Sequence, residues 1–141
     1  MKRMILLMFS MLLAGFVSAV LAAEVDPDGS GWQLIHENPQ GTLLSMHSGS
    51  MVRSPEGFTR VWMKYETPAA NSPSPMLFLN EFDCAGGLVR RLEVRLYRST
   101  VAGSGEPFST MTFDGKWDRP SEGIEKQLQE AVCQGEIKKS L

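Results

Sequence analysis

The sequence predicts an α+β domain in which an antiparallel sheet of about six strands packs against one C-terminal helix. Through the middle of the chain, apolar and polar residues alternate with a period of two. Stretches rich in glycine and proline separate the alternating runs, as in chains of hairpins. Near residue 121 the apolar spacing changes to that of a helix. Strands that are dry on one side and wet on the other are typical of antiparallel sheets.

The strand pattern begins at residue 32 and continues to residue 113. The turn "SPEG" has proline at its second position, which suits a β-turn, and "ETPAANSPSP" contains three prolines, which forbid a ladder of hydrogen bonds. We expect residues 42–46 and 48–53 to form a pair of strands joined by a turn. The expected strands are residues 32–36, 42–46, 48–53, 59–65, 76–84, 88–97 and 108–113.

Alternation within each strand assigns side chains to the two faces of the sheet. Phe78, Phe82 and Cys84 share one parity, so this face is expected to be the core. In the strand 59–65, one face carries Val61, Met63 and Tyr65, and the other carries Arg60, Trp62 and Lys64. In the strand 88–97, Leu88, Leu92, Val94 and Leu96 form the dry side, and Val89, Arg91, Glu93, Arg95 and Tyr97 form the wet side.

The C-terminal helix is expected to start after Ser121, a residue type that caps helices, with acidic residues near its positive end. Its apolar stripe consists of Ile124, Leu128, Ala131 and Val132. Gly123 weakens the start, and Gly135 is expected to stop the helix. The helix should cover the sheet face to which Cys84 points.

The N-terminus has the pattern of a secretory signal peptide. Lys2 and Arg3 precede an uncharged run from residue 4 to 23, and small residues follow the apolar core. We expect cleavage after Ala22 or Ala23, with Ala19 as the alternative. An uncleaved membrane anchor is the competing interpretation of the same run. The stretch "LLAGF" resembles a lipoprotein cleavage box, but phenylalanine stands where the lipidated cysteine is needed.

The predicted organisation is therefore a signal peptide at residues 1–22, a flexible lead-in at 23–30, one domain at 31–135 and a polar tail at 136–141. Without the signal peptide, twelve basic and sixteen acidic residues remain. Nucleic-acid-binding domains are usually basic, so we expect no nucleic-acid partner. After cleavage we expect no membrane span and a periplasmic or secreted location.

Cys84 and Cys133 are the two cysteines of the chain. In an exported protein an even number of cysteines indicates disulfide bonding, so we expect the pair Cys84–Cys133. Two separate buried thiols are the alternative.

Three segments in order resemble the surface-adhesin protein E-like family of small exported bacterial proteins. They are "RVWMKYETP", "NEFDCAGGLVRRLEVRLY" and "GKWDRPSEGIEKQLQEAVC". The resemblance covers residues 32–133. It implies a sheet with a C-terminal helix held by the disulfide, and a domain without catalytic activity. The family is named after an adhesin that binds host extracellular proteins.

The residues offer little for catalysis. His36 and His47 are the only histidines, no G-x-S-x-G elbow is present, and two histidines without a Cys-x-x-Cys make a poor zinc site. Glu81 and Asp83 lie roughly 7 Å apart on one side of a strand, a spacing that could suit a glycosidase. We interpret them as solvated residues of a sheet face. No cofactor, metal or enzyme activity is expected.

The outer face of the sheet is the candidate binding surface, because cationic and aromatic side chains alternate there. Such a patch suits an acidic polymer or an envelope or extracellular protein. The competing interpretation is a wet face on which Arg and Lys stems cover Trp62. The predicted function is a non-enzymatic binding domain; a structural or stress-related periplasmic protein without a dedicated ligand is the alternative. The candidate residues are Arg60, Trp62, Lys64, Arg91, Arg95 and Tyr97.

Overall fold

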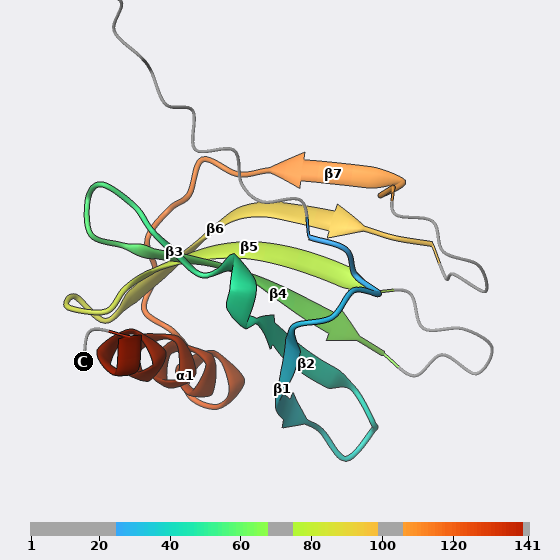
Figure 1. Ribbon diagram of the computed structural model, residues 1–141, viewed down its shortest axis with the longest axis horizontal. Helices are drawn as coiled ribbons and strands as arrows, with labels where there is room; N and C mark the ends of the chain where they lie inside the picture. Colours follow the sequence, from blue (N-terminus) through green and yellow to red (C-terminus); the bar gives the residue numbers. More distant parts are fainter. Residues whose placement is uncertain (1–24, 68–74, 99–105, 140–141) are drawn as a thin grey trace, which may run out of the picture.

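In the part of the chain that the structure describes, a seven-stranded antiparallel sheet packs with one α-helix (Figure 1). The computed structural model describes residues 25–67, 75–98 and 106–139, with side chains as far as residue 135. The strand order is β1-β2-β4-β5-β6-β7, and β3 pairs with β4 outside this path. The elements are β1 (Trp32–Glu37), β2 (Leu43–His47), η1 (Ser48–Ser50), β3 (Val52–Arg53), β4 (Thr59–Glu66), β5 (Met76–Asp83), β6 (Leu88–Leu96), β7 (Ser109–Thr112) and α1 (Ile124–Lys139).

The predicted fold class is confirmed, together with the disulfide that joins the sheet to the helix. Cys84 follows β5 and is bonded to Cys133 of α1, with their Cα atoms 5.6 Å apart. Leu128 and Val132 of α1 pack onto the sheet with Val61 and Phe82. In Figure 1, α1 lies at the opposite end of the sheet from β7. The helix therefore covers only part of one sheet face.

The expected end of the helix and the expected pairing of residues 48–53 are both wrong. The helix does not stop at Gly135 but continues to Lys139, so most of the expected polar tail is helical. Gly135 does not adopt the positive φ of a C-terminal glycine cap, because the backbone is still helical there. Residues 48–53 do not pair with 42–46. They form the 3-10 turn η1 and the two-residue β3, and Ser50 Oγ accepts a hydrogen bond from the Trp62 amide at 3.0 Å.

A register shift in β6 overturns part of the predicted face assignment. Glu93 pairs with Leu79, but Arg91 pairs with Asn80, so β6 holds one extra residue, Leu92, between them. A bulge of this kind reverses the parity of the strand on either side of it. Residues from Glu93 onward keep the predicted faces. Before the bulge the faces are exchanged, and Val89 packs under the helix.

The sheet has a second core on the face opposite α1. Trp62 and Tyr97 are each only 1 % exposed, and they pack with Val25, Leu77 and Leu79. The lead-in expected to be flexible contributes to this core from residue 25 onward, because Val25 is buried and Pro27 is fully buried. Residues 1–24, which include the predicted signal peptide, lie outside the described residues. A face predicted to be wet is therefore partly closed by the N-terminal segment.

Candidate functional site

The six residues of the predicted binding face do not share one surface. Arg60, Trp62, Lys64, Arg95 and Tyr97 lie on the face opposite α1, as their pairing in β4, β5 and β6 requires. Arg91 lies on the helix side, because the bulge at Leu92 turns it to the face of Asn80. The prediction is therefore wrong for Arg91.

The aromatic members of this set are not available to a partner. Trp62 is buried, and the guanidinium carbon of Arg95 lies 4.5 Å from the centroid of its ring. Lys64 Nζ donates to the Pro27 carbonyl at 2.9 Å and lies 5.0 Å from the centroid of the Trp32 ring. The competing interpretation, in which basic side chains cover Trp62, describes this arrangement better.

The cationic members of the same face are neutralised within the domain. Arg60 is paired with Glu81 at 2.7 Å, Lys64 with Glu66 at 3.2 Å, and Arg95 with Glu93 at 2.6 Å. Partial burial acts to lower the pKa of Arg95, but the hydrogen bond that Arg95 donates to Glu93 and the negative charge of Glu93 outweigh it and raise that pKa. These cations already have carboxylate partners, so the face offers little charge for an acidic ligand.

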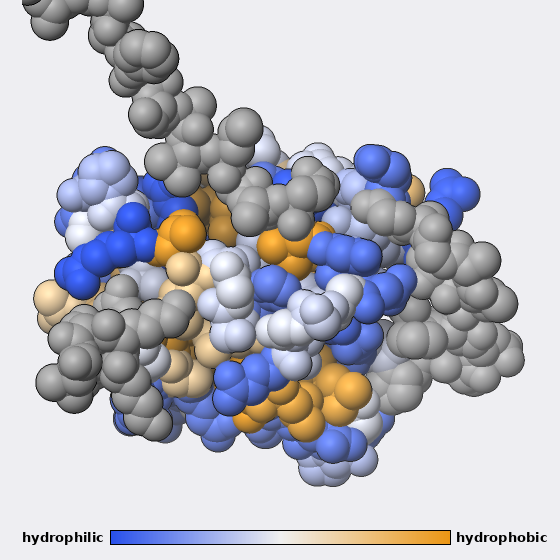
Figure 2. All heavy atoms as spheres, viewed as in Figure 1, coloured by the Kyte–Doolittle hydropathy of each residue, from blue (hydrophilic) through white to orange (hydrophobic). Residues whose placement is uncertain are grey.

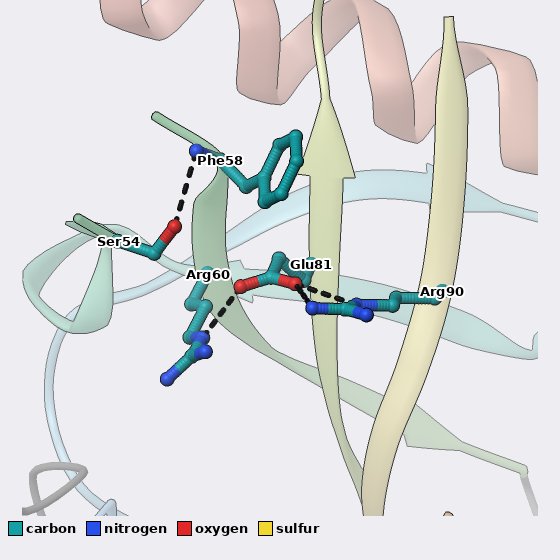
Figure 3. Close-up of polar contacts among 5 residues, drawn as sticks. All are labelled: Ser54, Phe58, Arg60, Glu81 and Arg90. Carbon is teal, nitrogen blue, oxygen red and sulfur yellow. Dashed lines mark hydrogen bonds and ion pairs between the residues drawn. The ribbon is translucent and has the colours of Figure 1, made fainter. Parts of the chain in front are cut away.

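Glu81 is a buried carboxylate held between two arginines (Figure 3). Its register partners on the neighbouring strands are Arg60 and Arg90, which approach from either side. Arg60 Nε donates to Oε1 at 2.7 Å, and Arg90 Nε donates to Oε2 at 2.6 Å. The interpretation of Glu81 as a solvated residue is wrong, since its exposed fraction is 0 %. Both of its oxygens are engaged, which leaves neither for acid–base chemistry.

Asp83 also has a structural role. Its Oδ1 accepts a hydrogen bond from the Gly86 amide at 2.8 Å, and its carbonyl accepts one from the Gly87 amide at 2.9 Å. Gly87 has a φ of 66°, a conformation in which glycine is favoured. Asp83 therefore closes the turn between β5 and β6, close to the disulfide.

The two histidines belong to neighbouring strands of the sheet, β1 and β2. His47 Nε2 is 3.0 Å from the Ser30 carbonyl, and its ring contacts Trp32 edge-on at 5.1 Å. His36 belongs to the edge strand β1, where it pairs with Leu44. Within residues 25–67, 75–98 and 106–135, no group of three His, Cys, Asp or Glu side chains is placed to hold a metal ion.

A groove of about 350 Å³ lies on the helix side of the sheet, between α1, β6 and the chain after β7. Its size is within the range of small-ligand pockets. Apolar side chains and one amide line part of it, namely Asn80, Phe82, Val89, Phe113 and Leu128. Charged residues make up the rest: Arg90, Arg91, Asp114, Lys116, Asp118, Arg119 and Glu125. Of these, Arg90 points its guanidinium to the other face, where it pairs with Glu81. Sequence reasoning found Arg91 but missed the groove, because the residues after 113 showed no strand pattern.

The wall of the groove is fixed by backbone pairing. Asp118 and Val89 exchange two backbone hydrogen bonds, of 2.9 and 3.0 Å, which hold the chain after β7 against β6. Gly115 makes this approach feasible: it has a φ of 70°, and an added Cβ would lie 3.0 Å from the Arg90 side chain. On the other side of the sheet, Trp117 packs with Arg90, whose guanidinium lies 4.4 Å from its ring centroid.

The charges around the groove differ from those of the opposite face, because several remain unpaired. Arg91, Lys116 and Arg119 form no ion pair with another residue of the described chain. Glu125 is engaged by Ser121, whose amide and hydroxyl donate to Oε2 at 2.8 and 2.7 Å. Hydrogen bonds from Ser121 and the charge of Arg91 lower the pKa of Glu125. The groove therefore combines apolar surface with three basic groups that form no ion pair within the described chain.

Comparison with known proteins gives a family for this fold. The family model of surface-adhesin protein E matches residues 32–134. The chain belongs to this family. The match covers every strand, the disulfide and all residues of the groove, which places the groove within the surface-adhesin protein E domain.

Neither curated proteins nor solved structures provide a significant match. In the part of the chain that the structure describes, no helix is long and apolar enough to cross a membrane. The family and the disulfide together are consistent with an exported or surface protein.

Proposed function

We propose that this domain is a non-enzymatic binding module of the cell envelope, located in the periplasm or secreted, which binds a protein or polymer partner through the groove beside α1. The observation that carries the proposal is the set of three unpaired basic side chains next to an apolar floor. Basic side chains beside an apolar floor suit a partner that has both apolar and acidic groups.

The contrast between the two sheet faces supports this location. On the face opposite α1, the aromatic residues are buried and the cations are matched by carboxylates. On the helix side, the sheet is only partly covered by α1, and Arg91 is exposed above the Phe78 ring at 4.6 Å. On the face seen in Figure 2, apolar residues lie in separate groups among polar and charged side chains, rather than as one broad apolar surface. This distribution favours a binding surface that combines apolar and charged side chains over a purely apolar one.

The test is capture of partners by the immobilised mature domain from an envelope extract of its native cells, followed by chemical crosslinking. The groove variant is Arg91→Glu combined with Lys116→Glu. The matched control is Arg53→Glu, which reverses an exposed charge on β3 outside the groove. Thermal melting checks that all three proteins are folded.

We expect the wild type and the control to retain the same partner, and the groove variant to lose it. Equal retention by all three proteins would show that the groove is not the binding site. If the wild type captures no partner that survives washing and crosslinking, the domain has no dedicated ligand in the envelope and the proposal fails.

A further inference from the structure

β7 forms a free edge of the sheet. It pairs with β6 on one side, and no strand of the described chain pairs with its other side (Figure 1). A sheet edge presents backbone N–H and C=O groups that can bind another extended chain. The four residues of β7 include Thr110, Met111 and Thr112, which are all exposed.

The two edges of the sheet differ in how they are protected. The stretch "STMTF", residues 109–113, contains no charge and no proline, and β7 pairs with β6 without a register shift. β1, at the other edge, carries Glu37, has a register shift between Leu34 and His36, and contacts α1. Charges and bulges are the usual means by which proteins prevent edge pairing. β7 has neither, so it is the edge that is open to pairing.

Exposed apolar side chains gather at this edge. Six large apolar side chains are exposed in the described part of the chain, and three of them lie in residues 108–113. They are Phe108, Met111 and Phe113, with exposed fractions of 55 %, 43 % and 46 %. Apolar groups concentrated on an exposed surface mark an interaction site.

We propose that β7 binds an extended segment of a partner protein, which adds to the sheet as a further strand. Backbone hydrogen bonds to β7 supply the affinity, and alternate side chains of the segment contact Met111 and Phe113. Phe113 belongs both to this edge and to the groove, so the bound segment continues from the edge towards Arg91. This inference rests on the proposed function and narrows its partner to a protein segment.

A second copy of this chain is a less suitable occupant. Four residues of strand extend over only about 13 Å, at roughly 3.3 Å per residue. A stable protein–protein interface buries roughly 1,200–2,000 Å², which is more than one four-residue strand pair provides. A peptide that also occupies the groove adds contacts that β7–β7 pairing lacks.

The experiment selects short peptides from a random displayed library on the folded wild-type domain. Each selected peptide is then synthesised with N-methyl groups on one or the other alternate set of its residues. Strand addition uses every second amide of the added strand, so one methylated set should abolish binding and the other should preserve it. Met111→Lys places a charge on the edge, and Leu34→Lys is the control on β1, where Leu34 is 53 % exposed.

We expect Met111→Lys to weaken peptide binding by about tenfold or more and Leu34→Lys to leave it unchanged. If both methylated sets bind equally, or if no peptide is selected, strand addition is excluded. If selected peptides bind with either set methylated and lose binding only to the Arg91→Glu and Lys116→Glu variant, the groove is the site and the edge is not. A dimer in sedimentation that Met111→Lys dissociates would show that a second copy is the occupant.

Discussion

Replacing Glu81 with glutamine removes a buried negative charge from between two arginines while it preserves the shape of the side chain. The carboxylate is fully buried, whereas the side chains of Arg60 and Arg90 are 37 % and 25 % exposed. In the variant, the two guanidinium groups face each other across β5 without a counter-ion. We therefore expect the variant to fold with a lower free energy of unfolding.

The magnitude follows from the two charged hydrogen bonds that Glu81 accepts. Each is worth about 1.5–3 kcal/mol when both partners are buried. Because both arginines are partly solvated, the total is reduced to about 2–3 kcal/mol. With a urea slope of about 1.5 kcal/mol per M for a domain of this size, the unfolding midpoint should fall by about 1.3–2 M.

The assay is urea unfolding followed by tryptophan fluorescence, with equal slopes required for the comparison. Glu66→Gln breaks the pair with Lys64 and serves as the control, with an expected loss below about 1 kcal/mol. Arg90→Met should cost more than Arg60→Met, because Arg90 also stacks on Trp117 at 4.4 Å. A midpoint for Glu81→Gln within about 0.3 M of the wild type would refute the view that this triad stabilises the sheet.

Three further perturbations address the helix and its attachment. Replacing both Cys84 and Cys133 with serine opens a loop of sequence separation 49, which should lower stability by about 4 kcal/mol in the chain-entropy model and be visible as a lower melting temperature. Glu125→Gln should destabilise the domain by less than about 1 kcal/mol at neutral pH. The pKa of Glu125 is lowered in the folded state, so its contribution to stability is present above the ordinary pKa of 4.5 and is lost as the pH falls through the folded pKa. The wild type and Glu125→Gln should therefore become equally stable in acid. A gap in urea midpoints that stays constant with pH would contradict this. Gly123→Ala should cost about 1 kcal/mol in thermal melts, because φ is 98° there although the space around it is open; an unchanged melting temperature would contradict the strain.

The sequence was sufficient to predict those strands and the helix that are marked by the spacing of residues close together in the chain. Alternation after the turn at 54–57 and on both sides of the turn at 85–87 located β4, β5 and β6, and the change of period located α1. The pairing of Cys84 with Cys133 followed from the cysteine count and an exported location. The site could not be located in the same way, because it depends on contacts between residues far apart in the chain. The bridge between Val89 and Asp118, which builds the wall of the groove, has no counterpart in local spacing.

The bulge at Leu92 explains why an accurate strand prediction led to the wrong binding face. The stretch "RLEVRL" alternates regularly, and in a regular strand Arg91 and Arg95 would point the same way. The sheet, however, has two cores, and β6 contributes to both of them: Val89 packs under α1, and Leu92 packs beside the core of Trp62. In a regular strand Val89 and Leu92 lie on opposite faces, but Val94 then shares the face of Leu92. In this sheet Val94 instead lies on the face of Val89. One extra residue resolves this conflict, and it leaves Arg91 on the helix side next to the groove.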